Sequence, residues 1–252
     1  MNNMNGLVSS LVSVFITNNK NQNQNQKSSP EERFFSSVVG YADLKKLLMK
    51  SMLSKEPIHI LLTGPPSTSK TVFLLDMLNG LDNAYFIDAT GASGPGMMDH
   101  LFAGKTKYLL IDEIDKLKKS DQAVLLNVMQ TGIVSETKSR GKTRQRKINL
   151  WIYATSNNVE KLSSPLRSRF MEFHLAEYKF DEFVEITRHL LKDRYKLDGV
   201  LSEKIADSVW NKMKSKDIRD VIKMAKLTAS CSDVDWLTEV QMEYGKHRIS
   251  SN

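Results

Sequence analysis

Residues 63–71 read TGPPSTSKT, so a glycine turn leads to a lysine followed by a hydroxyl residue. This stretch lies between the apolar run 58–62 and an apolar helical pattern that continues to Leu81. Backbone N–H groups of such a strand-to-helix loop can point at phosphate oxygens. Lys70 would then reach the β- and γ-phosphates of a nucleotide, and the Thr71 hydroxyl would ligate Mg²⁺. The predicted nucleotide-binding residues are Gly64, Pro65, Pro66, Ser67, Thr68, Ser69, Lys70 and Thr71.

One position of this loop departs from the phosphate-loop pattern G-x-x-x-x-G-K-[ST]. Ser69 stands where the pattern has its second glycine. If that position requires an unusual φ, a serine there is strained and nucleotide binding is weakened. The alternative interpretation of the whole stretch is an ordinary turn between a strand and a helix.

A second motif, LLIDEID at residues 109–115, is an apolar strand that ends in paired acids. Asp112 would hold the Mg²⁺ coordination sphere, and Glu113 would act as the general base that polarises the attacking water. Acids at the end of a strand are often only solvated loop residues. A lysine loop on one strand followed by Asp-Glu on a later strand favours ATP hydrolysis with Mg²⁺.

Polar residues also follow the next apolar run. Asn157 could hold the water between Glu113 and the γ-phosphate, and Thr155 is the alternative polar residue for this role. Arg167 and Arg169 come next, and arginine suits phosphate because it is always charged and bidentate. Spacing alone does not decide which arginine faces a neighbouring subunit's nucleotide and which makes a surface salt bridge.

The elements that must position these residues alternate along the chain. Near-continuous apolar runs, which predict buried parallel strands, lie at 58–62, 84–87, 108–111, 148–154 and 171–175. Helical stretches between them predict an α/β fold with a parallel five-stranded sheet covered by helices on both faces. Beyond Tyr178 the strands stop, and amphipathic helices are predicted at 180–195, 202–214, 217–230 and 234–247.

Length and composition are those of a folded, ordinary globular chain. Of its 252 residues, 40% are apolar and 26% are charged. The single cysteine, Cys231, excludes an internal disulfide and predicts a reducing, cytoplasmic compartment. The apolar stretch at 6–17 is too short to span a bilayer, so we expect no membrane association. We expect it to be a docking peptide or a frayed terminus, ahead of a disordered Asn/Gln-rich linker at 18–26.

Together the four motifs resemble the AAA+ ATPases, and within them the branch of RuvB-type Holliday-junction motors. The stretches that carry the resemblance are LLTGPPSTSKT, LLIDEIDKL, IYATSN and LSSPLRSRF. The resemblance implies a P-loop core at 30–176, a helical lid at 177–252 and an apolar segment with a linker at 1–29. It also implies a homo-oligomeric ring, often a hexamer. The chain leaves no room after the lid for the winged-helix domain of RuvB, so we expect a different mode of DNA binding.

The same resemblance assigns roles to four further residues. Arg169 is implied to be the finger that acts on a neighbour's nucleotide, and Arg219 to be a second sensor that contacts the γ-phosphate. Val39 and Gly40 fall where the family lines the adenine pocket.

A basic cluster accounts for nearly all of the net charge of +7. The β-prone arms around Gly141 predict a hairpin at about 133–152, which resembles the pre-sensor hairpin of the branch with RuvB, MCM and MoxR proteins. Its bases fall mainly at every second position, so many could share a face. With no aromatic residue within 138–147, sequence-tolerant phosphate binding is expected, with a protein partner or plain solvation as alternatives. The predicted nucleic-acid-binding residues are Lys138, Arg140, Lys142, Arg144, Arg146 and Lys147.

Three functions are compatible with these motifs. The first is a ring ATPase that moves or remodels DNA. The second is a MoxR-like chaperone that remodels a protein partner. The third is a nucleotide-gated loader that turns ATP over slowly.

Overall fold

Two compact units make up the chain in the computed structural model, which describes residues 29–91, 94–137 and 143–245. Of these residues, the first unit contains those within 29–63 and 69–174, and the second contains those within 64–68 and 175–245. The N-terminal segment and most of its linker, and the hairpin tip with Lys138, Arg140 and Lys142, lie outside the described residues. Within the described part of the chain, no helix is long and apolar enough to cross a membrane.

A parallel five-stranded sheet forms the centre of the first unit, with strand order β2-β3-β6-β1-β7. This confirms the predicted α/β fold. Each strand coincides with one of the predicted apolar runs to within a few residues. The strands are β1 (Ile60–Thr63), β2 (Ala84–Asp88), β3 (Tyr108–Asp112), β6 (Trp151–Ser156) and β7 (Met171–His174).

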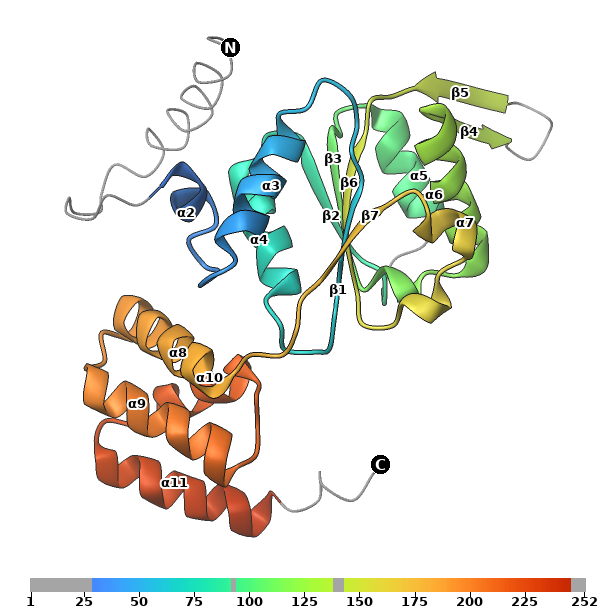
Figure 1. Ribbon diagram of the computed structural model, residues 1–252. Coiled ribbons are helices and arrows are strands. Elements are labelled where there is room, and N and C mark those ends of the chain that lie inside the picture. Colours follow the sequence, from blue (N-terminus) through green and yellow to red (C-terminus); the bar gives the residue numbers. More distant parts are fainter. Residues whose placement is uncertain (1–28, 92–93, 138–142, 246–252) are drawn as a thin grey trace. The chain divides into compact units, whose positions relative to one another are not determined.

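Helices cover both faces of this sheet (Figure 1). One face packs on α5 (Gly94–Ala103), α6 (Lys119–Thr131) and α7 (Ser164–Arg167), and the other packs on α3 (Ala42–Met52) and α4 (Lys70–Gly80). Helix α2 (Pro30–Phe34) packs on α3 and α4. Successive residues of each strand point alternately to the helices on one face of the sheet and to those on the other. Leu109 and Ile111 join the core under α5 and α6, whereas the hydroxyl of Tyr153 lies 2.9 Å from that of Ser51 on α3. Short 3-10 turns at Ile114–Lys116 and Val159–Lys161 follow β3 and β6.

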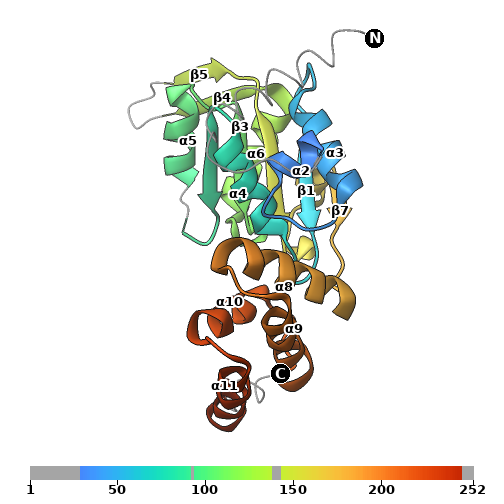
Figure 2. The same ribbon diagram turned by 90° about the vertical axis from the view of Figure 1, so that its left-hand side faces the viewer.

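The predicted hairpin forms a separate two-stranded sheet, β4 (Ile133–Thr137) and β5 (Thr143–Lys147). It ends earlier than expected, because Trp151 begins β6 of the main sheet. The arrowheads of β1 and β3 point away from the hairpin (Figure 2). The hairpin therefore lies at the amino ends of the strands, whereas the polar motifs follow their carboxyl ends.

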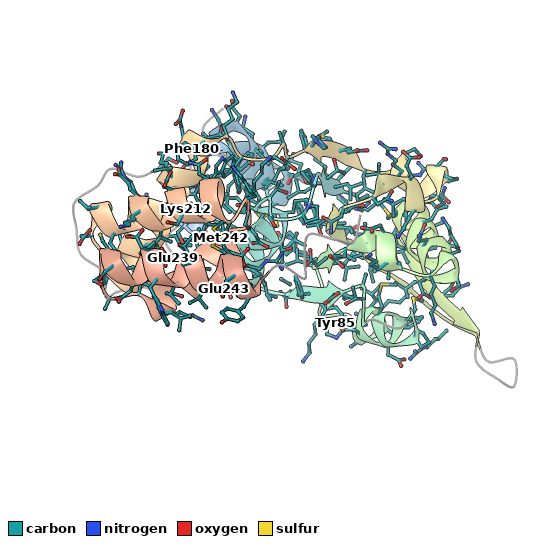
Figure 3. The ribbon with its side chains drawn as sticks, turned by 90° about the horizontal axis from the view of Figure 1, so that it is seen from below. Tyr85, Phe180, Lys212, Glu239, Met242 and Glu243 are labelled. Carbon is teal, nitrogen blue, oxygen red and sulfur yellow. The ribbon has the colours of Figure 1, made fainter. Side chains whose placement is uncertain are left out.

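Helices build the second unit. They are α8 (Phe180–Tyr195), α9 (Gly199–Asp207), a π-helical turn (Ser208–Lys212), α10 (Ile218–Leu227) and α11 (Cys231–Tyr244). Trp210 anchors this bundle, with its ring centroid 5.8 Å from that of Phe180 and 5.0 Å from that of Phe183. Figure 3 labels Phe180 on α8 and Met242 on α11. Met242 is 49% exposed.

Candidate nucleotide-binding site

The phosphate-loop candidate requires glycine at its first position. Gly64 has φ 139°, and a Cβ there would lie 2.1 Å from the carbonyl oxygen of Leu175. Both the backbone angle and the close approach exclude any other residue without a shift of the backbone.

Ser69, in contrast, has an ordinary backbone. Its φ of −59° is one that any residue adopts, and it directly precedes α4. The condition for the expected strain at Ser69 is therefore not met. The left-handed conformation lies two residues earlier, at Ser67, which has φ 67°. The motif pattern places a glycine at position 69, but the path of this loop puts the unusual angle at position 67.

We expect Ser69→Gly, which restores the glycine of the pattern, to change ATP affinity by less than about twofold, since serine is unstrained there. Nucleotide titration by calorimetry measures this. Ser67→Val serves as the contrasting variant, because a β-branched residue at positive φ is costly and should weaken binding. A gain of about tenfold for Ser69→Gly would contradict the interpretation of the loop.

Hydroxyl and carboxylate oxygens meet where α4 begins and β3 ends. The Thr71 hydroxyl lies 3.0 Å from both carboxylate oxygens of Asp112, and the Thr155 hydroxyl donates to Asp112 Oδ1 at 2.5 Å. Thr155 Oγ1 also accepts a hydrogen bond from the backbone N–H of Glu113 at 3.0 Å. The structure thus brings together Thr71 and Asp112, the two predicted Mg²⁺ ligands. Thr155, the predicted alternative to Asn157, contacts the side chain of Asp112 and the backbone of Glu113.

Glu113 and Asn157 form the second half of this cluster. The Asn157 amide Nδ2 donates to Glu113 Oε1 at 3.1 Å. Glu113 itself has φ 52°, a left-handed conformation that is unusual outside glycine and is often found at functional sites. The predicted base and the predicted sensor are therefore in direct contact.

Asp115 belongs to this cluster, although no role was predicted for it. Its side chain is buried, and Oδ1 accepts from the Ser156 hydroxyl at 3.0 Å and from the backbone N–H of Asn157 at 3.2 Å. Asp115 therefore ties the turn after β3 to the end of β6. The only sequence signal was an acid two residues after Glu113.

Lys70 is a buried cation beside three acids. Burial lowers the pKa of Lys70 to about 8, while Asp112, Asp115 and Glu113 act in the opposite direction. At neutral pH the ammonium is thus still mostly charged, and an anion next to it would favour the charged form further. This environment suits a phosphate-binding lysine.

The two arginines before β7 have different surroundings. Arg167 is held by Glu172, with Nε–Oε2 at 2.8 Å, and by Glu160 at 3.6 Å. Arg169 is exposed, and within the described residues its side chain makes no ion pair or hydrogen bond. Sequence spacing could not separate them, and their contacts differ: Arg167 is paired within its own chain, whereas the role of Arg169 at a neighbour's nucleotide remains a prediction.

Arg219 lies in the second unit and is paired two residues away. Its Nε lies 2.8 Å from Asp217 Oδ2 and its Nη2 lies 2.7 Å from the same oxygen. Burial raises the pKa of Asp217, but the hydrogen bonds and charge of Arg219 lower it more, to a net value below the usual range. A cavity of about 930 Å³ within this unit has Ser67, Lys216 and Asp217 in its wall. The γ-phosphate contact of Arg219 remains a prediction.

Three basic residues of the hairpin, Arg144, Arg146 and Lys147, lie within the described part of the chain, and their contacts differ. Arg144 pairs with Asp99 at 2.5 Å and lies 4.0 Å over the Phe102 ring, and Arg146 donates to the Phe102 carbonyl at 2.8 Å. The register explains this, because both arginines share the strand face of buried Val134, which points toward α5. Arg144 and Arg146 do share a face, as predicted, but this face of the hairpin packs on α5 of the same chain. Lys147 lies on the opposite face and is exposed.

Comparisons with known proteins agree with this geometry. Residues 60–178 match the family described as "ATPase family associated with various cellular activities (AAA)". The Holliday junction branch migration complex subunit RuvB of Prochlorococcus marinus is 28% identical over 157 residues, which cover 58% of this chain and 44% of that protein. RuvB of Lacticaseibacillus casei is 29% identical over 140 residues, which cover 52% and 41%. The chain thus spans less than half the length of these curated relatives.

Solved structures show the same fold. The Thermotoga maritima RuvB Holliday junction branch migration motor superposes with a TM-score of 0.61 at 21% identity, covering 80% of this chain and 70% of that one. A variant of the same protein gives a TM-score of 0.65 at 20% identity, covering 82% and 72%. The chain therefore has the fold of the AAA+ core of these solved structures, and its residues 60–178 match the AAA family model. In sequence it is similar to the RuvB proteins.

Proposed function

We propose that this chain hydrolyses ATP with Mg²⁺ as part of a ring-shaped oligomer, and that the energy moves or remodels DNA. The observation that supports hydrolysis most directly is the paired cluster at the carboxyl end of the sheet. There, Thr71 and Asp112 face each other at 3.0 Å beside the contact between Asn157 and Glu113 at 3.1 Å.

The residues of this cluster fit a magnesium ion. Hydroxyl and carboxylate oxygens are the donors that Mg²⁺ prefers, and Thr71 and Asp112 supply one of each. When bound with ATP, the ion neutralises charge on the phosphate oxygens. Lys70 would add a second positive charge at the β- and γ-phosphates.

Hydrolysis then requires a water held in line with the γ-phosphate. Glu113 Oε2 would accept the water's proton, while the amide of Asn157 fixes the other carboxylate oxygen, Oε1. Thr155 and Asp115 hold these two residues through their backbones. Catalysis on this arrangement consists of positioning and charge stabilisation, without a covalent intermediate.

The exposed Arg169 supports the ring. An arginine with no partner among the described residues of its own chain can reach a neighbour's γ-phosphate, where such a finger accelerates hydrolysis. Each site would then be completed by the next subunit.

The hairpin supports DNA as the polymer. It begins where α6 ends and leads into β6, so its second arm is continuous with a strand whose carboxyl end is followed by Asn157. The relatives' names associate them with Holliday junctions. Protein remodelling of the MoxR kind, or slow nucleotide-gated loading, is the alternative function.

Steady-state ATPase rates with single-stranded, duplex and four-way-junction DNA, at low and moderate salt, test the DNA proposal. We expect stimulation that falls with salt. If all six basic residues of the hairpin contact duplex phosphates, the slope of log K, the DNA-binding constant, against log salt is roughly −5. If Arg144 and Arg146 make no such contact, the slope is roughly −3.6.

Two variants of equal charge change make this test specific. The first changes Lys138, Arg140, Lys142 and Lys147 to glutamine and should abolish stimulation. The control changes four exposed lysines on other elements, Lys46, Lys50, Lys179 and Lys226, and should retain it. A robust rate that is indifferent to DNA in the unaltered protein would favour protein remodelling, and tight nucleotide retention with slow turnover would favour the loader.

A further inference from the structure

Lys45 is a charged side chain with no exposed surface. It lies on α3, and its Nζ is 2.6 Å from Glu32 Oε2 and 2.7 Å from the carbonyl oxygen of Val38. A buried ammonium is unfavourable unless it is paired and hydrogen-bonded, so these two acceptors must stay in place around it. Both acceptors belong to the segment 29–41 that precedes α3.

A second buried charge holds the same segment from another helix. Asp76 on α4 is 6% exposed, and its Oδ2 accepts from the backbone N–H of Ser37 at 3.0 Å. Helix α4 begins with Lys70 and Thr71. The segment is thus tied directly to the helix that follows the phosphate loop.

Aromatic packing completes this attachment. Phe35 is fully buried, with its ring 5.3 Å from that of Phe73 on α4, and Tyr41 lies 5.9 Å from the same ring. Val39 is half-buried and Gly40 is exposed with φ 75°. The two buried charges hold Ser37 and Val38, directly before Val39 and Gly40, and the Tyr41 ring packs directly after them. The backbone of Val39 and Gly40 is thus held at both ends, while Gly40 remains exposed.

We propose that Lys45 and Asp76 are positioning residues that fix the backbone of residues 38–40 for recognition of the nucleotide base. This rests on the proposed ATP binding and on adenine lying against Val39 and Gly40. Adenine and guanine differ in hydrogen-bonding sense at position 6, where one has an amino donor and the other a carbonyl acceptor. A backbone N–H or C=O group that is held in one position can pair with only one of these two groups. The other base would leave it unpaired, so the site discriminates strongly between adenine and guanine. Lys45 and Asp76 therefore determine base selectivity without touching the nucleotide.

The test compares affinities for ATP, GTP and inorganic tripolyphosphate by calorimetry. In Lys45→Met a side chain of similar length keeps the site filled, and Glu32, whose side chain is 42% exposed, can be hydrated. We expect this variant and Asp76→Ala to bind ATP about tenfold more weakly, with KM raised and kcat within twofold. Their preference for ATP over GTP should be lost, while tripolyphosphate binding stays unchanged.

Two matched variants separate positioning from general damage. Lys46→Met removes the neighbouring lysine of α3, which is exposed, and should leave all affinities unchanged. Asp76→Asn keeps an oxygen for the Ser37 N–H and should restore most of the selectivity lost in Asp76→Ala. Because selectivity is a ratio within one variant, a partly destabilised protein still gives an answer.

The inference is overturned if Lys45→Met retains the ATP-to-GTP preference of the unaltered chain, or if the unaltered chain has no such preference. In both cases ATP binding and hydrolysis would stand. If the unaltered chain binds no nucleotide, the proposed function fails first and the inference fails with it.

Discussion

Glu113→Gln is expected to bind ATP with unchanged affinity and to hydrolyse it at least about 100-fold more slowly, the lower end of what a general base contributes. Glutamine has the same shape and can keep the hydrogen bond from Asn157, which lies 3.1 Å from Oε1. It cannot accept the proton of the attacking water. The loss should therefore fall on kcat, because the interaction matters in the transition state and not in the bound ground state.

Two measurements check this expectation. Calorimetric titration with ATP gives the affinity, and phosphate release at saturating ATP gives kcat. Glu56→Gln, which changes an exposed glutamate before β1 and outside the four motifs, serves as the control and should hydrolyse at the unaltered rate. A turnover of Glu113→Gln within a few fold of the unaltered protein would refute the assignment of Glu113 as the base.

Local patterns predicted the sheet well because its three central strands, β1, β3 and β6, are buried on both faces. Such strands are near-continuous apolar runs, as at 108–111, and the polar residue that ends each run marks the carboxyl edge of the sheet. The cluster of Thr71, Asp112, Glu113 and Asn157 follows from this, because parallel strands bring their carboxyl ends together. Helix α8 was predicted with its observed bounds for a similar reason, namely its apolar periodicity.

Features that depend on packing between distant segments could not be predicted in the same way. The strand pattern placed Arg144 and Arg146 on a common face but did not reveal that α5, with Asp99 and Phe102, lies against it. The buried contacts of Asp115 depend likewise on the approach of β6 to the turn after β3. In each case the sequence contains the residue, and only the tertiary fold supplies its partner.

The backbone angles of the predicted phosphate loop could not be predicted from the sequence either. A motif records which residue type is usual at a position, whereas strain depends on φ, and φ depends on the whole path of the loop. Ser69 looked unusual in the pattern and is relaxed, while Ser67 looked unremarkable and has φ 67°.

Arg169→Ala is expected to reduce ATP hydrolysis by about 10³-fold or more, the effect of removing an arginine finger, with ATP affinity changed far less. The reason is that the guanidinium stabilises charge that develops on the phosphate during transfer. Arg167→Ala is the matched control two residues away. Its guanidinium is held by Glu172 at 2.8 Å within the same chain at the surface, so its loss should change the free energy of unfolding little and leave kcat nearly unchanged.

Mixing two inactive variants tests whether the finger acts between subunits. An Arg169→Ala subunit has an intact Glu113, and a Glu113→Gln subunit has an intact Arg169. If the finger reaches a neighbour's nucleotide, some interfaces of a mixed ring combine both intact groups, so mixing should restore part of the activity that neither variant has alone. If the finger acted within its own chain, no subunit of the mixture would have a complete site and the mixture would stay inactive. Unreduced hydrolysis by Arg169→Ala alone would instead exclude it as a catalytic residue and return the choice to Arg167, which would first have to leave Glu172.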